Sequence, residues 1–155
     1  MSALHIGIVG GGVGGLAAAI ALRSAGHRVS IFEQAGKFAR VGADINLTPN
    51  AVRALDGLGL GVGAAVRKHG AQPTFRISRD WDTGLETSRL GMGNVAEQQY
   101  GAPQVTIHRA DVLAALTDAL PADLIQFGRR LKSLEDGAGA VALHFEDGGS
   151  EQVDV

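Results

Sequence analysis

The sequence predicts an α/β fold built around a Rossmann-like βαβ unit, with an added β-meander toward the C-terminal end. Three observations predict it: a short apolar strand runs into a glycine-rich turn, an alanine-rich helix follows, and a second apolar strand ends on an acidic residue. Two strands joined by one helix in this way lie parallel in the same sheet. A chain of 155 residues is long enough for one modest domain with its own core.

The composition is that of a globular protein and excludes several classes. Hydrophobic residues make up 45% and charged residues 19%, and the formal net charge is −2, so neither nucleic acid nor an anionic membrane is expected as a partner. There is no cysteine, and the histidines lack metal-ligand spacing, so no metal is expected. Residues 6–22 are uncharged, but no basic segment precedes them, which favours a cytoplasmic protein over a signal peptide.

The N-terminal elements follow the βαβ pattern. Residues 4–9 are expected to form a short buried strand, residues 16–25 a helix that is apolar nearly all round, and residues 29–32 the second strand. Gly26 suits the end of the helix, because a glycine there accepts a left-handed conformation without strain.

The rest of the chain alternates short elements. Thr48 as N-cap and Pro49 in the first turn open another helix. A hairpin is expected around residues 82–84, with Trp81 packing on it, whereas residues 91–101 are expected to form a loop. The other expected elements are a weak helix at 62–68, a strand at 104–108, a helix at 111–120, a strand at 124–127 and a meander of strands at 129–135, 141–146 and 152–155.

Gly10, Gly12 and Gly15 have the spacing of a dinucleotide-binding turn. The first glycine permits the turn, the second lets the backbone approach a pyrophosphate, and the third lets the helix pack closely on the strand. Amides at the helix N-terminus hold phosphates without a lysine, and the lack of Gly-Lys-Ser/Thr excludes a nucleoside-triphosphate loop. Glu33 can accept hydrogen bonds from an adenosine ribose and would repel a 2′-phosphate, which disfavours NADP here. FAD and NAD stay open, because both carry ADP.

Three segments resemble group A flavoprotein aromatic hydroxylases, in the order found in that family. Residues 7–34 end in Ile-Phe-Glu-Gln, residues 42–51 (Gly-Ala-Asp-Ile-Asn-Leu-Thr-Pro-Asn-Ala) resemble the segment beside the flavin, and residues 107–112 (Ile-His-Arg-Ala-Asp-Val) resemble the segment whose arginine contacts FAD. The resemblance covers essentially the whole chain and is strongest to the salicylate and 6-hydroxynicotinate hydroxylase branch. It implies FAD as the cofactor and NAD(P)H as a transient reductant.

The resemblance also implies roles for individual residues. Asn46 stands where the nearest branch has a histidine, so a histidine-assisted role does not transfer, and Asp44 replaces a common glycine. No catalytic acid or base is assigned. The pyrophosphate is expected at Gly10, Gly12, Gly14 and Gly15, the adenosine ribose at Glu33 and Gln34, the isoalloxazine ring at Asn46 and Leu47, further cofactor contacts at Arg40 and Arg109, and the adenine end at Leu131.

The parent protein implied by the resemblance hydroxylates a small phenolic or N-heteroaromatic acid with O₂ and NAD(P)H, through a flavin C4a-hydroperoxide. Residues 152–155 read as a strand that has just begun, so residues 1–155 are expected to be the truncated N-terminal part of an FAD-binding domain, inactive alone. Residues 73–104 are expected to be an excursion that belongs to the substrate-domain sheet. Two alternatives stay open: another Rossmann NAD or FAD oxidoreductase, and a non-catalytic nucleotide-binding fragment that self-associates, for instance as a homodimer, through unpaired strand edges.

Overall fold

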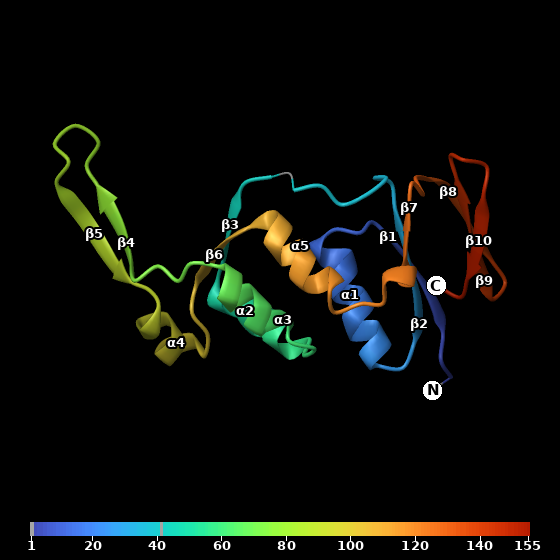
Figure 1. The fold of residues 1–155 in the computed structure, drawn as a ribbon, viewed down its shortest axis with the longest axis horizontal. Coiled ribbons are helices and arrows are strands. Elements are labelled where there is room, and N and C mark those ends of the chain that lie inside the picture. Colours follow the sequence, from blue (N-terminus) through green and yellow to red (C-terminus); the bar gives the residue numbers. More distant parts are fainter. Residues whose placement is uncertain (1, 41) are drawn as a thin grey trace. The chain divides into compact units, whose positions relative to one another are not determined.

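The structure, a computed structural model, describes residues 2–40 and 42–155. It divides into two units, one formed by residues up to 40 together with 116–155, and the other by residues 41–115. Each unit has its own strands and helices (Figure 1). The first unit contains the predicted βαβ unit and meander, and the second contains the predicted hairpin.

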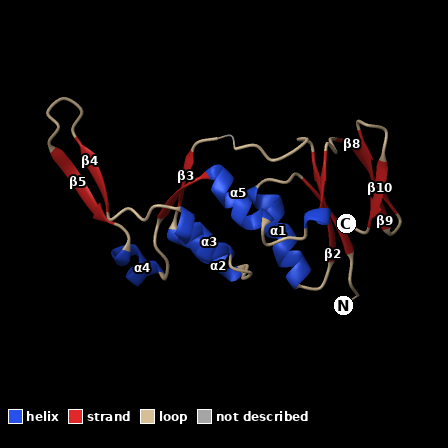
Figure 2. Ribbon diagram, viewed as in Figure 1, coloured by secondary structure: helices blue, strands red, loops and turns tan. Residues whose placement is uncertain are grey.

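A parallel sheet forms the centre of the first unit (Figure 2). β2 (Arg28–Glu33) lies in the middle and pairs in parallel with β1 (His5–Val9) on one side and with β7 (Ile125–Phe127) on the other. α1 (Val13–Ser24) connects β1 to β2, and the short 3-10 helix η1 (Ala122–Leu124) precedes β7. The predicted α/β class and the predicted βαβ unit are confirmed.

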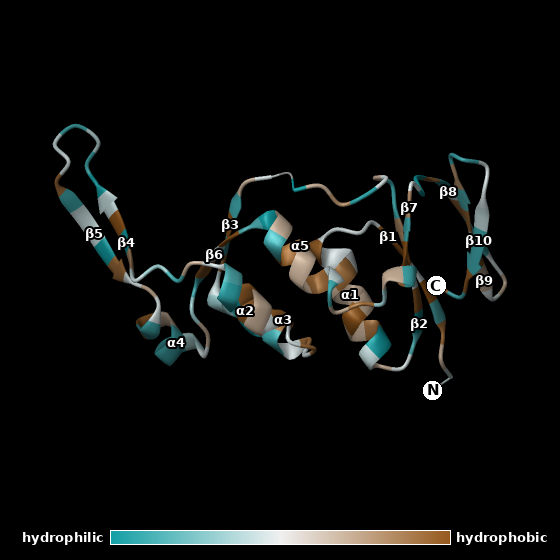
Figure 3. Ribbon diagram, in the orientation of Figure 1, coloured by the Kyte–Doolittle hydropathy of each residue, from teal (hydrophilic) through white to brown (hydrophobic). Residues whose placement is uncertain are grey.

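α1 is apolar along most of its length (Figure 3). It begins at Val13 and not at residue 16, because Gly12 serves as its N-cap and the glycines that follow fit into the first turn. Gly26 beyond its end has a φ of 90°, as expected of a glycine that stops a helix. Its buried side chains, spaced to share one face, are Leu16, Ala19 and Ile20.

The meander is confirmed as an antiparallel sheet in the order β10-β9-β8. Its strands are β8 (Leu131–Gly137), β9 (Ala140–Phe145) and β10 (Ser150–Val153). Phe32 of β2 packs against the meander, and its ring centroid lies 4.9 Å from that of Phe145. The buried cluster at this contact consists of Phe32, Leu143, Phe145 and Val153.

The second unit contains two antiparallel pairs of strands. β3 (Asp44–Leu47) pairs with β6 (Val105–His108), and β4 (Phe75–Arg79) pairs with β5 (Glu86–Gly91) as the predicted hairpin. Around these strands the chain forms α2 (Pro49–Gly57), α3 (Val62–His69), α4 (Asn94–Tyr100) and α5 (Arg109–Thr117). The second boundary between the units falls within α5.

Several predictions for this unit are wrong in detail. Residues 91–101 are not a loop, because α4 occupies Asn94–Tyr100. The seven residues of this helix are mostly polar, bury only Ala96 and show no amphipathic pattern. No pattern in the sequence predicts β3, which has four residues. α5 covers Arg109–Thr117 and not residues 111–120, and Trp81 is 95% exposed at the hairpin turn instead of packing on it.

The start of α2 agrees with the sequence in position but not in bonding. Thr48 is the N-cap, with Pro49 after it, as predicted. Its hydroxyl makes no bond to a backbone amide of the first turn, and donates instead to Asn50 Oδ1 at 2.6 Å. Pro49 fixes the first helical φ, which favours the helix start without a side-chain cap.

Candidate functional site

The glycine loop joins β1 to α1 and leaves the N-terminus of the helix uncapped. Its N-cap residue, Gly12, has no side chain that could accept a bond from the first-turn amides, and the first turn holds no acidic residue. A Cβ atom at Gly12 or Gly14 would meet nothing within 4 Å. Uncapped amides and open space beside the backbone are what a phosphate at a helix N-terminus requires.

The other two motif glycines are required by the fold. Gly10 has a φ of 106°, a conformation that favours glycine, and its amide donates to Phe32 O at 2.8 Å. A Cβ atom at Gly15 would lie 2.0 Å from the carbonyl oxygen of Gly10. Any side chain at Gly15 would therefore push α1 away from the turn, which agrees with the close-packing role of the third glycine in this motif.

Glu33 holds the glycine loop from the end of β2. Its Oε2 accepts the Gly11 amide at 2.7 Å, and its Oε1 accepts the Ala35 amide at 2.8 Å. These two bonds fix the carboxylate beside the loop. Each carboxylate oxygen has a further lone pair, so the group can still accept a hydrogen bond from a ribose hydroxyl.

A cavity of about 250 Å³ lies beside this carboxylate, and we call it the Glu33 cavity. It brings together four of the predicted site residues, Gly10, Glu33, Gln34 and Leu131, from the loop, the end of β2 and the start of β8. The full lining is Val9, Gly10, Phe32, Glu33, Gln34, Arg129, Arg130 and Leu131.

Sequence reasoning missed two arginines in this lining. The Arg129 amide donates to Glu33 O at 2.9 Å, while its guanidinium lies 4.2 Å from the centroid of the Phe145 ring and Nη1 lies 2.8 Å from Asp147 Oδ2. Arg130 is exposed, with Nε 3.5 Å from Glu146 Oε1. The available signal is the pair of adjacent arginines directly before Leu131, which was itself expected at the adenine end.

Asp147 holds Arg129 in its position in the lining of the Glu33 cavity. The Gly149 amide and then the Arg129 guanidinium hold the pKa of Asp147 below its ordinary value, because both donate to the carboxylate. The charged carboxylate therefore keeps the guanidinium in place over Phe145.

In the second unit, Asn46 and Leu47 lie on β3 and alternate in direction. Leu47 is buried opposite Val105, whereas Asn46 is exposed opposite Thr106, whose hydroxyl donates to Asn46 Oδ1 at 2.6 Å. Asn46 therefore has its amide nitrogen available for a ligand, while Leu47 belongs to the core.

The two predicted arginine contacts lie in different units. Arg109 begins α5 in the second unit; its amide donates to Ala43 O at 3.2 Å, and its side chain passes Gly42, where a Cβ would lie 3.6 Å from Arg109 Cβ. Arg40 is exposed at the end of the first segment of the first unit.

Asn46 also lines a second cavity, of about 500 Å³, which we call the Asn46 cavity. Its walls mix amide, hydroxyl, apolar and cationic side chains: Asn46, Thr48, Pro73, Phe75, Arg76, Met92, Gln104 and Thr106. Of these residues, only Asn46 was predicted for the site. A third cavity, of about 670 Å³, lies between the start of α2 and the end of α4 and contains none of the predicted residues.

Within the described residues, 2–40 and 42–155, no helix has both the length and the apolar character needed to cross a membrane. The same part of the chain has no group of three or more His, Cys, Asp or Glu side chains placed to bind a metal ion.

The fold and the glycine loop are those of a Rossmann-type α/β domain. In agreement, a family model described as an NAD(P)-binding Rossmann-like domain matches residues 8–64. The chain is 39% identical over 151 residues to 6-hydroxynicotinate 3-monooxygenase of Bordetella bronchiseptica. This match covers 97% of this chain and 39% of that protein. It is 40% identical over 154 residues to salicylate hydroxylase of Pseudomonas putida, covering 98% of this chain and 35% of that one.

Among solved structures, HpxO of Klebsiella pneumoniae complexed with FAD and uric acid matches with a TM-score of 0.86 and 27% identity, over 98% of this chain and 38% of that one. The chain is thus related over nearly its whole length to FAD-dependent aromatic monooxygenases, which confirms the resemblance identified in the sequence. It spans 39% of the length of the 6-hydroxynicotinate monooxygenase.

Proposed function

We propose that this chain is the FAD-binding part of an NAD(P)H-dependent monooxygenase that hydroxylates a small aromatic acid. The observation that carries the proposal is the uncapped glycine turn, held by the Glu33 carboxylate and continued by the Glu33 cavity. Similarity to a structure complexed with FAD supports FAD as the ligand. The names of the relatives, a hydroxynicotinate monooxygenase and a salicylate hydroxylase, support an aromatic acid as substrate and O₂ as co-substrate.

The residues present fit this cofactor. The open space at Gly12 and Gly14 accepts a pyrophosphate against the backbone. The close contact between Gly15 and the Gly10 carbonyl oxygen leaves no room for a side chain at Gly15. FAD, when bound, supplies the redox chemistry that takes reducing equivalents from NAD(P)H and activates O₂. In this proposal Glu33 and Gln34 bind the ribose, Leu131 lines the adenine end, Asn46 and the backbone of Leu47 border the ring, and Arg40 and Arg109 make further contacts.

The β4–β5 hairpin supports the proposal that residues 73–104 belong to a substrate-domain sheet. In these two strands every residue except Gly91 is exposed, including Phe75, Ile77 and Leu90 at 52%, 40% and 56%. A hairpin open on both faces is marginally stable alone and gains stability when further strands cover it.

We also propose that the whole protein is cytoplasmic.

Binding of NAD in the glycine loop is the second candidate, because the matching family model describes NAD(P) binding. Titration of the purified chain with FAD and with NAD separates the two. We expect saturable quenching of flavin fluorescence and a yellow protein with absorption at about 450 nm. Tight NAD binding with no flavin binding would overturn the FAD proposal.

A matched pair of variants tests the location. Gly12→Val places a side chain in the open space where the phosphate is expected, whereas Gly36→Val places one in equally open space outside the loop. Neither glycine has a positive φ, so both variants keep the backbone conformation. We expect Gly12→Val to lose FAD binding and Gly36→Val to retain it. Equal FAD affinity in the two variants would contradict the proposed phosphate position.

A further inference from the structure

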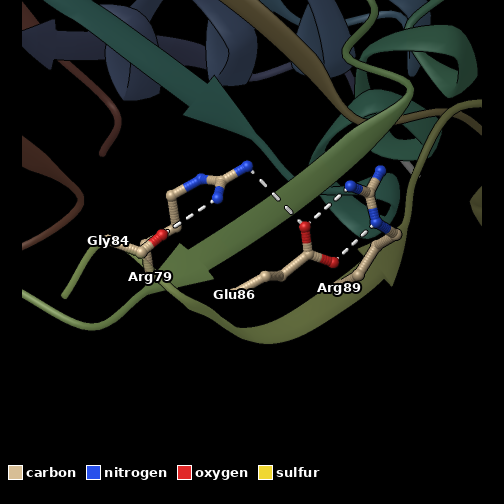
Figure 4. A network of polar contacts seen from close by, with 4 residues as sticks. All are labelled: Arg79, Gly84, Glu86 and Arg89. Atoms are coloured by element: carbon tan, nitrogen blue, oxygen red, sulfur yellow. Dashed lines mark hydrogen bonds and ion pairs between the residues drawn. The ribbon is translucent and has the colours of Figure 1, made fainter.

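Arg76 differs from the other two arginines of the β4–β5 hairpin. Figure 4 shows Arg79 and Arg89 on either side of Glu86: Arg89 Nε and Nη2 each donate to this carboxylate at 2.7 Å, Arg79 Nη2 lies 3.8 Å from it, and Arg79 Nη1 donates to Gly84 O at 3.0 Å. For Arg76, no hydrogen bond or ion pair is found within residues 2–40 and 42–155. Arg76 is one of the residues that line the Asn46 cavity.

The walls of the Asn46 cavity suit an aromatic ring. Phe75, Pro73 and Met92 supply apolar surface, and a thioether and an aromatic ring both make favourable contacts with a second ring. The lining contains no Asp or Glu, so the Arg76 charge is not neutralised by the cavity itself. At about 500 Å³, the cavity is within the range of small-molecule sites, roughly 300–1,000 Å³.

Besides Arg76 on the hairpin, the cavity has polar side chains on the paired strands β3 and β6, namely Asn46 and Thr106. Thr106 donates to Asn46 Oδ1 at 2.6 Å, which fixes the orientation of the Asn46 amide and leaves its N–H donors for a ligand. Asn46 is also the residue expected beside the isoalloxazine ring. A ligand held between Arg76 and Asn46 therefore lies next to the expected position of the reactive ring.

We propose that the Asn46 cavity binds the ring of an aromatic monocarboxylate and that the Arg76 guanidinium receives its carboxylate. A guanidinium matches a carboxylate through two parallel N–H···O bonds, which selects an acid over a neutral analogue of the same shape. The proposal rests on the proposed function, and it adds the residue that selects the acid. It concerns Arg76 alone among the three hairpin arginines, because Glu86 already occupies the other two.

The test compares salicylate with its neutral analogue salicylamide on the full chain, with and without FAD. Binding is measured by isothermal titration, and its location by backbone amide shifts of ¹⁵N-labelled protein. We expect salicylate to move the amides of Asn46, Met92 and Thr106. Arg76→Gln should weaken salicylate binding by at least about tenfold and leave the weaker salicylamide binding unchanged, because only the acid gains from the charged fork.

Arg79→Gln is the matched control, since it removes an arginine from the same strand outside the cavity, and it should bind salicylate as the unaltered chain does. No salicylate binding by the unaltered chain, equal affinity in Arg76→Gln, or an equal loss for salicylamide would each overturn the proposal. FAD affinity, followed by flavin fluorescence, should be the same in Arg76→Gln and the unaltered chain. Loss of FAD binding by the unaltered chain would instead count against the proposed function.

Discussion

The Glu33 carboxylate accepts the backbone amide of Gly11 at 2.7 Å, so the acid at the end of β2 holds the turn at the end of β1. Its other oxygen accepts the Ala35 amide at 2.8 Å. The acid expected to bind ribose is thus also a structural part of the loop. Changes at Glu33 should therefore affect loop stability and ligand binding together.

Glu33→Gln should lower both stability and FAD affinity. The new amide group can accept only one of the two backbone N–H bonds, and its NH₂ then faces the other donor. Because hydrogen bonds to a charged group contribute about 1.5–3 kcal/mol, we expect a loss of about that size, measured by urea unfolding. FAD affinity should fall at least about tenfold by fluorescence titration. Glu135→Gln, at an exposed position on β8, serves as control, and equal behaviour of the two variants would refute this role of Glu33.

Gly14 and Gly15 are neighbours with opposite tolerance for a methyl group. Gly15→Ala would bring Cβ to 2.0 Å from Gly10 O, so the turn or α1 must move, and we expect a loss of about 1–3 kcal/mol. Gly14→Ala meets nothing within 4 Å and replaces a glycine inside a helix, which should leave stability unchanged or raise it by up to about 1 kcal/mol. Thermal unfolding of the two variants gives the comparison. A stable Gly15→Ala would show that the loop is not packed as described.

The sequence could predict the elements whose signal is local. The strand–glycine–helix pattern of β1 and α1, and the alternation of the meander, lie within short stretches of chain, and both are found. β3 and α4, of four and seven residues, are too short to show a period. They form because tertiary partners complete them: β3 pairs with β6, and α4 buries Ala96.

The site was predictable only where a motif identifies it. Gly10 and Glu33 belong to such a motif, but Thr106 reaches Asn46 across 60 positions of sequence, and only the β3–β6 register makes them neighbours. Register depends on strand pairing, which no single stretch of sequence specifies. Arg76 and Arg129 were missed for the same reason, since their neighbours in the fold are distant in the chain.

Asp56 and Arg67 connect α2 to α3 through a two-pronged ion pair, with Arg67 Nη2 at 2.7 Å from Asp56 Oδ2. The Arg67 hydrogen bond lowers the pKa of Asp56, so the charged carboxylate stabilises the fold above the ordinary pKa of aspartate and loses this effect as the pH falls through the lowered value. Asp56→Asn should be less stable at pH 7 by about 0.2–1 kcal/mol, because both side chains are partly exposed.

The difference between Asp56→Asn and the unaltered chain should vanish in acid, when Asp56 is protonated in both the folded and the unfolded state. Urea unfolding at a series of pH values measures it. Asp118→Asn, at an exposed position, controls for the general effect of removing a negative charge. A stability difference that persists unchanged to the lowest pH would show that the ion pair is not its source.

Arg129→Met tests how the wall of the Glu33 cavity is held. The methionine keeps apolar contact with the Phe145 ring but removes the guanidinium, whose side chain is 18% exposed and whose Nε has no hydrogen-bond partner within the described residues. The pKa of Asp147 should rise toward its ordinary value yet stay below it, because the Gly149 amide is the larger cause of its lowering. Carboxyl ¹³C shifts followed against pH measure this directly.

Arg130→Met, next in sequence but paired with Glu146, should leave the Asp147 titration unchanged. If Arg129→Met shifts nothing, or if Arg130→Met shifts as much, then Arg129 does not hold Asp147, and the wall of the cavity depends on the backbone bond between Arg129 and Glu33 alone.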